Sequence, residues 1–96
     1  MSPSNRKKLG KIRFELDKLD NLLIKLIKRR TNLVNKVLSL KEKKNQIIDQ
    51  KRIKSILKNI RKKSLKNKID PKITSRIWKN MIFAYIDYEK RNFKKK

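Results

Sequence analysis

An unbroken apolar stripe with alternating spacings of three and four residues constrains this chain more than any other feature. Its members are Leu9, Ile12, Leu16, Leu19, Leu23, Leu26, Leu33, Val37 and Leu40, and Arg30 occupies one position among them. This repeat is typical of a coiled-coil seam, so we predict one continuous helix that ends near Lys44. At about 1.5 Å per residue that helix is roughly 50 Å long, and two short helices of the same chain cannot cover it. A second copy is therefore predicted to pack along it.

Two shorter helices are predicted to follow. Residues 45–48 have the pattern of a loop, and Asp49 is a favourable N-cap for a helix whose stripe is Ile53, Ile56, Leu57 and Ile60. This helix fades into the polar stretch 62–68. Asp70 and Pro71 start a third helix, because Asp caps helices and Pro is favoured at the first helical position. The apolar residues that we expect this helix to bury are Ile73, Ile77, Trp78, Met81, Ile82, Tyr85 and Ile86, with Phe93 further along.

The order long, short, medium predicts an all-α fold with three helices per chain in an intertwined homodimer. A single Gly and two Pro residues leave little turn material for a sheet. We expect a flexible basic N-terminus over residues 1–8, a single helical domain over residues 9–93 and a lysine tail over residues 94–96. The N-terminus has no apolar signal segment, and no stretch approaches the ~20 apolar residues of a membrane span. A soluble cytoplasmic protein is predicted.

Composition excludes several kinds of site. The chain has no Cys and no His, which excludes disulfides, thiolate metal sites, ordinary zinc sites and catalytic Ser–His or Cys–His pairs. We therefore expect neither a metal nor a cofactor. The net charge is +23, but the excess is mostly Lys spread along the chain, which favours a solvated surface. Anionic partners, small ones included, are expected, and nucleic acid is not the expected partner.

Charged residues interrupt the apolar stripes. Arg30 lies in the seam of the long helix, where an unpaired charge costs several kcal/mol. Lys41 lies on nearly the same face at ~100° per residue, whereas Arg13 points about 100° away. One helix thus directs Arg30 and Lys41 toward one cavity and Arg13 toward another. In an intertwined dimer, that other cavity belongs to the partner chain. Glu89 continues the stripe of the third helix, and it either pairs with Arg30, as a register-setting ion pair, or serves a binding site.

At these positions the sequence resembles the all-helical (AroQ-class) chorismate mutases. Arg13, the run LDKLDNLLIKLIKRR that begins at Leu16, and Lys41 match the first helix of that family. The run from Asp49 to Arg52 resembles the family's D-x-x-R at the start of the second helix, and residues 69–71 and the third helix through Glu89 match as well. The resemblance covers nearly the whole chain. It implies the rearrangement of chorismate to prephenate, a step of the shikimate pathway to aromatic amino acids.

The resemblance also implies a role for each matching residue. Arg30 and Arg52 would bind the substrate carboxylates, joined by Arg13 from the other subunit. Lys41 would contact the ether oxygen and a carboxylate, and Glu89 matches a Gln or Glu that donates to the ether oxygen. The rearrangement is pericyclic and needs no base or nucleophile. It needs bidentate carboxylate binding, for which Arg is suited, and fixed donors aimed at the charge that develops on the ether oxygen.

Asp49 would lie near the ring hydroxyl, unless it only forms a capping ion pair with Arg52. Tyr85 falls where some members have a small polar residue.

One position departs from the family. The family has Glu directly after the helix-two Arg, bound to the ring hydroxyl, and here that residue is Ile53. The related isochorismate-pyruvate lyases have an apolar residue there. Such a lyase, a basic helical nucleic-acid-binding protein and an inactive regulatory helical dimer remain the alternatives.

Overall fold

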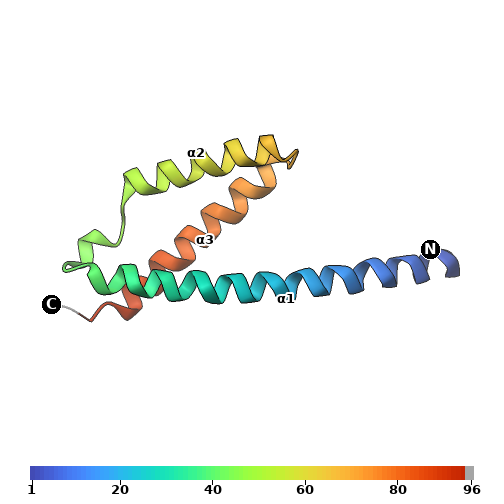
Figure 1. Ribbon diagram of the computed structural model, residues 1–96, viewed down its shortest axis with the longest axis horizontal. Coiled ribbons are helices and arrows are strands. Elements are labelled where there is room, and N and C mark those ends of the chain that lie inside the picture. Colours follow the sequence, from blue (N-terminus) through green and yellow to red (C-terminus); the bar gives the residue numbers. More distant parts are fainter. Residues whose placement is uncertain (95–96) are drawn as a thin grey trace. The chain divides into compact units, whose positions relative to one another are not determined.

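A computed structural model describes residues 1–94, and this range contains helices and no strands (Figure 1). Helix α1 spans Pro3–Leu40, the short 3-10 helix η1 spans Lys44–Gln46, α2 spans Gln50–Lys66 and α3 spans Pro71–Asn92. The predicted all-α class and the order long, short, medium are confirmed. None of the described helices combines the length and the hydropathy that a membrane span requires. Of the predicted lysine tail, residues 95–96 lie outside the described range.

The chain falls into two compact units, Met1–Leu33 and a second that begins at Val34, and each is described by itself. In the first unit α1 begins at Pro3, so the helix includes residues 3–8 and starts earlier than the stripe from Leu9 predicted. The physical reason is a complete start signal. Pro3 takes the first helical position, and the Ser2 Oγ accepts a hydrogen bond from the Asn5 amide at 3.2 Å.

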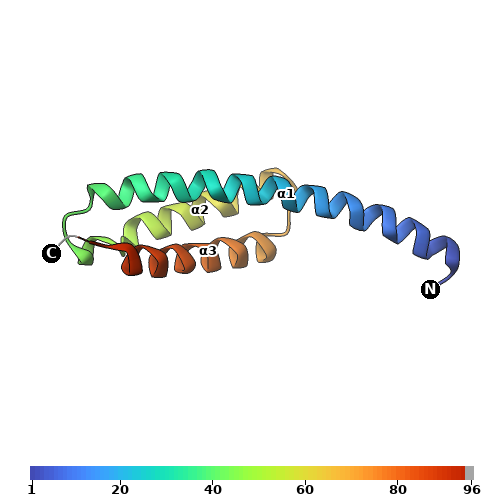
Figure 2. The same ribbon diagram turned by 90° about the horizontal axis from the view of Figure 1, so that it is seen from below.

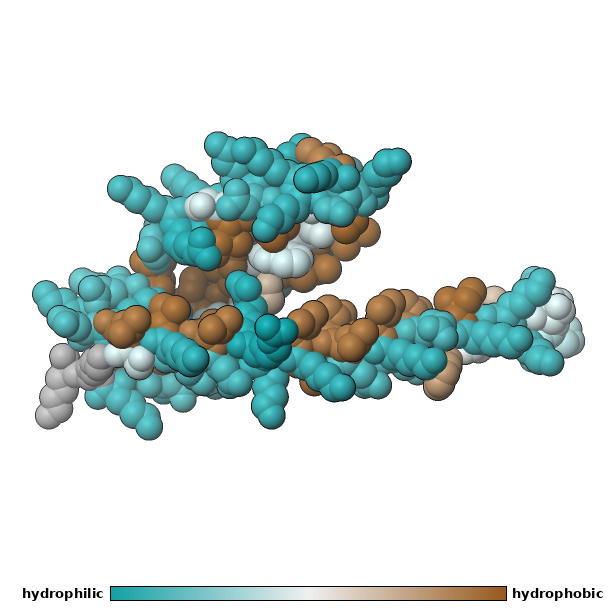
Figure 3. All heavy atoms as spheres, viewed as in Figure 1, coloured by the Kyte–Doolittle hydropathy of each residue, from teal (hydrophilic) through white to brown (hydrophobic). Residues whose placement is uncertain are grey.

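The apolar stripe of α1 is exposed along the first unit. Ile12, Leu16, Leu19, Leu23 and Leu26 each keep at least 52% of their surface accessible. In Figure 3 hydrophobic side chains form a row along this helix. A single helix has no interior, so such a stripe is buried only where another element packs against it.

The second unit combines the end of α1 from Val34 with η1, α2 and α3. Helices α2 and α3 lie side by side and antiparallel (Figures 1 and 2). The Oγ of Ser64 lies 2.7 Å from the Oγ1 of Thr74 and joins the two helices. Few side chains of the described chain are buried: Leu38, Ile47 and Ile82 among the hydrophobic ones, and Ser64 and Glu89 among the polar ones. The core of one chain is therefore small.

The predicted apolar face of α3 is only partly covered. Ile82 is buried, and Trp78, Met81, Tyr85 and Ile86 are half-buried. Ile73 and Ile77, which were also expected to be buried, are 57% and 52% exposed in the single chain. Ile77 precedes Trp78 by one residue and so points about 100° away from it, on the flank of the helix. The apolar face is wider than one neighbouring helix can cover.

The turn between α1 and α2 differs from the sequence prediction. Helix α1 ends at Leu40 rather than near Lys44, and the predicted loop contains η1. The side chain of Gln46 is the reason, because its Oε1 accepts hydrogen bonds from the amides of Glu42 and Lys43 at 2.8 and 2.9 Å. Because these two amides bond to Gln46, they do not continue the backbone hydrogen bonds of α1. Ile47, which follows Gln46, is buried with 3% of its surface exposed.

The helix starts predicted for α2 and α3 are confirmed. The Asp49 side chain caps α2, and Asp70 caps α3 by accepting from the Lys72 amide at 2.9 Å, with Pro71 at the first position. Helix α2 closes with a Schellman motif, in which the Ile69 amide donates to the Ser64 carbonyl at 2.9 Å. The residue in the left-handed position of this motif is Lys68, with φ 57°.

Candidate active site

Two of the predicted catalytic residues form an ion pair inside the second unit. The Lys41 Nζ lies 3.2 Å from the Glu89 Oε1, and the two side chains are 18% and 8% exposed. Lys41 directly follows the end of α1, and Glu89 lies in the last turns of α3. The predicted inward orientation of Glu89 is confirmed, because only 6% of the residue is accessible. A cation and a carboxylate are thus held together in a sheltered position.

The turn after α1 positions the Lys41 ammonium. Its Nζ also donates to the Ile47 carbonyl at 3.4 Å, while the Lys41 amide donates to the Leu38 carbonyl at 3.1 Å. The sequence analysis did not find Gln46 and Ile47, which hold this turn in place. A signal was available for Gln46, since a Gln three residues after a helix N-cap typically reaches back to the backbone.

Two tyrosines, Tyr85 and Tyr88, lie near Glu89 on α3. The Tyr88 hydroxyl donates to the Asn35 Oδ1 at 2.8 Å and so ties α3 to the end of α1. Tyr85, one of the predicted site residues, is half-buried and meets the Tyr88 ring edge to face, with the centroids 6.4 Å apart. Because Tyr85 precedes Glu89 by one helical turn, it lies on the same side of α3. Tyr88 and Asn35 were not predicted.

The start of α2 holds three further predicted site residues. The Asp49 Oδ1 accepts from the Arg52 amide at 3.0 Å, so Asp49 acts as an N-cap through the backbone and not through the Arg52 guanidinium. Arg52 is exposed, and Ile53 is half-buried on the apolar stripe of α2. Within residues 1–94, no hydrogen bond or ion pair joins these three residues to the pair of Lys41 and Glu89.

The remaining predicted site residues, Arg13 and Arg30, belong to the first unit. Both lie on α1. Their convergence with the residues of the second unit stays a prediction.

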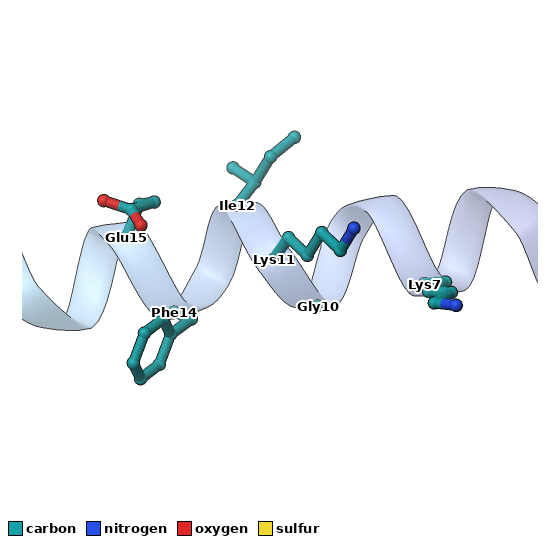
Figure 4. A pocket seen from close by; sticks show the side chains of 6 residues that line it. All are labelled: Lys7, Gly10, Lys11, Ile12, Phe14 and Glu15. Atoms are coloured by element: carbon teal, nitrogen blue, oxygen red, sulfur yellow. The ribbon is translucent and has the colours of Figure 1, made fainter.

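A hollow of about 540 Å³ on the N-terminal turns of α1 offers no alternative site. Six residues of the one helix line it, Lys7, Gly10, Lys11, Ile12, Phe14 and Glu15. In Figure 4 their side chains point in different directions and do not converge on a common point. The Lys18 Nζ lies 4.5 Å from the centre of the Phe14 ring, so this ring already contacts a cation of its own helix. Among the described residues, no group of three or more His, Cys, Asp or Glu could hold a metal ion.

Comparison with known protein families gives a match over most of the chain. Residues 12–90 match the family described as chorismate mutase type II. This range includes every predicted site residue from Arg13 to Glu89. No curated protein and no solved structure matches the chain.

Proposed function

The chain belongs to the chorismate mutase type II family, and from that premise we propose that it rearranges chorismate to prephenate as an intertwined homodimer. The observation that carries the proposal is the sheltered pair of Lys41 and Glu89, 3.2 Å apart at the meeting point of two helices. In the rearrangement a carbon–oxygen bond breaks while a carbon–carbon bond forms, and negative charge builds on the ether oxygen. Fixed donors at that oxygen stabilise the charge because they need no reorganisation during the reaction.

Lys41 and Glu89 are proposed as these donors. The Lys41 ammonium has three protons, and the turn around Gln46 and Ile47 fixes its position. Glu89 donates to an ether oxygen only in its protonated form, because an ionised carboxylate only accepts. We propose that the dianionic substrate takes over the Lys41 ammonium from Glu89.

The carboxylates of the substrate require further cations. We assign them to Arg30 and Arg52 of one chain and to Arg13 of the second, since a guanidinium binds a carboxylate through two parallel hydrogen bonds. The exposed position of Arg52 supports its assignment, because its guanidinium is accessible to a ligand. Asp49 already caps α2 and is proposed to contribute to the ring hydroxyl with its second oxygen. Tyr85 is proposed to line the same site.

The dimer is supported by what a single chain leaves exposed. The stripe of α1 and the flank of α3 at Ile73 and Ile77 are apolar and accessible, while only three hydrophobic side chains of the described range are buried. A domain of this size rarely reaches useful stability from so small a core. A second copy packed along α1 would bury apolar surface. Each Å² of apolar surface removed from water stabilises the dimer by about 25 cal/mol.

A second candidate function is an isochorismate-pyruvate lyase of the same fold. Ile53 favours it, because this residue lies one position after Arg52, where the mutases carry a Glu, and its half-buried side chain presents no hydrogen-bonding group. A lyase eliminates pyruvate from isochorismate with the same set of carboxylate-binding cations, so the remaining site residues do not distinguish the two activities.

One assay decides between them. Purified protein is given chorismate or isochorismate, the ultraviolet absorbance of each substrate is followed, and the products are identified by mass spectrometry. We expect chorismate to be consumed with prephenate as the product. Release of pyruvate from isochorismate at a much higher kcat/KM would establish the lyase. Loss of neither substrate would leave a helical dimer without this chemistry and overturn the proposal.

A further inference from the structure

Helix α2 is strongly cationic. It contains no Asp or Glu, and its cations are Lys51, Arg52, Lys54, Lys58, Arg61, Lys62, Lys63 and Lys66. From residue 50 to residue 86 the one acidic side chain is Asp70, which caps α3. The proposed catalysis uses only Arg52 of this group. The charge on the rest of α2 and on the first half of α3 therefore has no role in the rearrangement.

The cations of the two helices follow the same pattern. In α2, Lys54, Lys58 and Arg61 share one face at spacings of four and three, and in α3 the same spacings join Lys72, Arg76 and Lys79. Each row ends, four residues further on, in an exposed apolar side chain. These side chains are Leu65, which is 56% exposed, and Phe83, which is 63% exposed.

The fold brings these rows to one surface. A hollow of about 420 Å³ between α2 and α3 is lined by Leu57, Lys58, Arg61, Pro71, Ser75 and Lys79. A hollow of about 500 Å³ beside it is lined by Lys72, Ser75, Arg76, Lys79, Asn80 and Phe83. Because the two hollows share Ser75 and Lys79, they form one continuous surface, which we call the α2–α3 basic surface. No carboxylate lines it.

The cations of the α2–α3 basic surface have no ionic partners among residues 1–94. The described ion pairs involve Lys18, Lys41 and Arg91. The side chains of the five lining cations are exposed and make no described hydrogen bond or ion pair; these are Lys58, Arg61, Lys72, Arg76 and Lys79. Like charges that share a surface without counter-charges repel each other, and a polyanion relieves the repulsion. Figure 3 shows a largely hydrophilic surface over α2.

We propose that the α2–α3 basic surface binds single-stranded nucleic acid, as an activity separate from the proposed rearrangement. A phosphodiester chain fits a continuous concave surface with five cations, since each phosphate meets a Lys or Arg. Phe83, exposed at one end, offers a ring on which a base stacks, and base–aromatic stacking tolerates any sequence. A small anion would engage one hollow and leave the cations of the other unpaired. An anionic membrane is flat and would not reach into the hollows.

This surface is distinct from the proposed active site. Arg52 and Arg61 are nine residues apart on α2, so at ~100° per residue they point to opposite sides of the helix. On α3, Lys79 follows Ile77 by two residues and so points about 160° away from it, on the side opposite the flank of Ile73 and Ile77. Binding of nucleic acid and turnover of a small substrate can therefore occur in the same protein.

The test measures fluorescence anisotropy of a labelled oligouridine of about 16 nucleotides with the full-length protein, at NaCl concentrations from about 50 to 200 mM. Each phosphate contact to a single strand contributes about −0.7 to the slope of log K against log salt, so five contacts give about −3.5. The variant Lys58→Gln/Arg61→Gln/Lys79→Gln should reduce that slope by about 2. The matched control Lys8→Gln/Lys25→Gln/Lys28→Gln removes the same charge from α1 and should leave most of the affinity.

Phe83→Ala separates stacking from charge. It should weaken binding by about tenfold at every salt concentration while the slope stays unchanged, since the ring releases no counterions. All variants are compared with the parent by circular dichroism and by conversion of substrate, and we expect neither to change. Equal loss of affinity in the two triple variants would overturn the proposal, because it would reduce binding to net charge. Stronger binding to phosphatidylserine vesicles or to polyglutamate than to the oligonucleotide would assign the surface to a membrane or an acidic protein instead.

Discussion

The Lys41 ammonium and the Glu89 carboxylate lie 3.2 Å apart although 48 positions separate the two residues in the sequence. Two other ion pairs, Lys18 with Glu15 and Arg91 with Asp87, join neighbours on one helix and are more than half exposed. Such exposed local pairs contribute little to stability. The sheltered pair connects the end of α1 to the end of α3 and positions the two side chains that we propose as donors in the reaction.

The first prediction concerns the donor at position 89. If Glu89 donates to the ether oxygen, an amide at this position, whose NH2 group always donates, should support the reaction at least as well. Glu89→Gln should therefore keep or raise kcat relative to the parent. Both proteins are followed by loss of substrate absorbance at one fixed pH.

Two controls accompany this experiment. Glu89→Ala removes the donor altogether and should lower kcat by about 10²–10³. Lys41→Met removes the other donor and should lower kcat by a similar factor. A Gln variant as inactive as the Ala variant would contradict the assigned role of Glu89.

The second prediction concerns the crossing of chains in the dimer. Arg13→Ala and Arg30→Ala should each be inactive, but a mixture after subunit exchange should recover about a quarter of the parent activity. Half of the dimers are then mixed, and one of the two sites in each mixed dimer has both arginines. The matched control is a mixture of Arg30→Ala with Lys41→Met, in which no intact site forms. Recovery in that control, or sedimentation of the parent as a folded monomer of 11.6 kDa, would contradict the crossed arrangement.

The third prediction concerns specificity at Ile53. Ile53→Glu introduces the Glu that the family has at this position. The change should raise kcat/KM for chorismate by improving recognition of the ring hydroxyl. The half-buried Ile belongs to the stripe of α2, so the substitution should also cost roughly 1–2 kcal/mol of stability, measured by urea denaturation. Ile53→Gln and Ile56→Glu are the controls for size and for charge. An improvement with Ile56→Glu as large as that with Ile53→Glu would show that position 53 is not special.

The fourth prediction concerns the end of α2. Lys68 adopts φ 57°, a left-handed conformation in which a side chain is strained and Gly is not. Lys68→Gly should therefore stabilise the protein by about 0.5–1 kcal/mol, even after the greater freedom of Gly in the unfolded chain is subtracted. Lys66→Gly removes the same charge from the helix itself and should destabilise by about 1 kcal/mol. The free energy of unfolding of the parent and the two variants is measured by denaturation at one fixed protein concentration, because the stability of a dimer depends on concentration. A lower stability of Lys68→Gly would contradict the strain.

Local signals in the sequence were enough to predict most of the fold. The starts of α2 and α3 follow from Asp49, Asp70 and Pro71, whose side chains act within one turn of the backbone. The burial of Glu89 follows from helical spacing alone. The start of α1 at Pro3 was missed although Ser2 and Pro3 form the same kind of signal, because the basic composition of residues 1–8 suggested disorder instead.

Features that depend on contacts between distant residues could not be predicted. The partner of Glu89 was predicted as either Arg30 or a ligand, and the ion pair with Lys41 depends on where the turn around Gln46 places the ammonium. The exposure of Ile73 and Ile77 depends on how much of the apolar face of α3 the neighbouring helix covers. The spacing of apolar residues in the sequence does not show this. The scattered lysines form a surface only because α2 and α3 lie antiparallel.

The absence of acidic residues from α2 has a consequence for how the protein depends on dissolved salt. Its eight cations, Lys51, Arg52, Lys54, Lys58, Arg61, Lys62, Lys63 and Lys66, are brought closer together by folding, and their mutual repulsion opposes the compact state. Counterions weaken that repulsion over a Debye length of about 10 Å at 0.1 M. We therefore expect the melting temperature, followed by circular dichroism, to rise with added NaCl rather than fall as in a protein held by surface ion pairs; a fall would contradict this. In a salt solution the mobile ions of the solvent take the place of the carboxylates that α2 lacks.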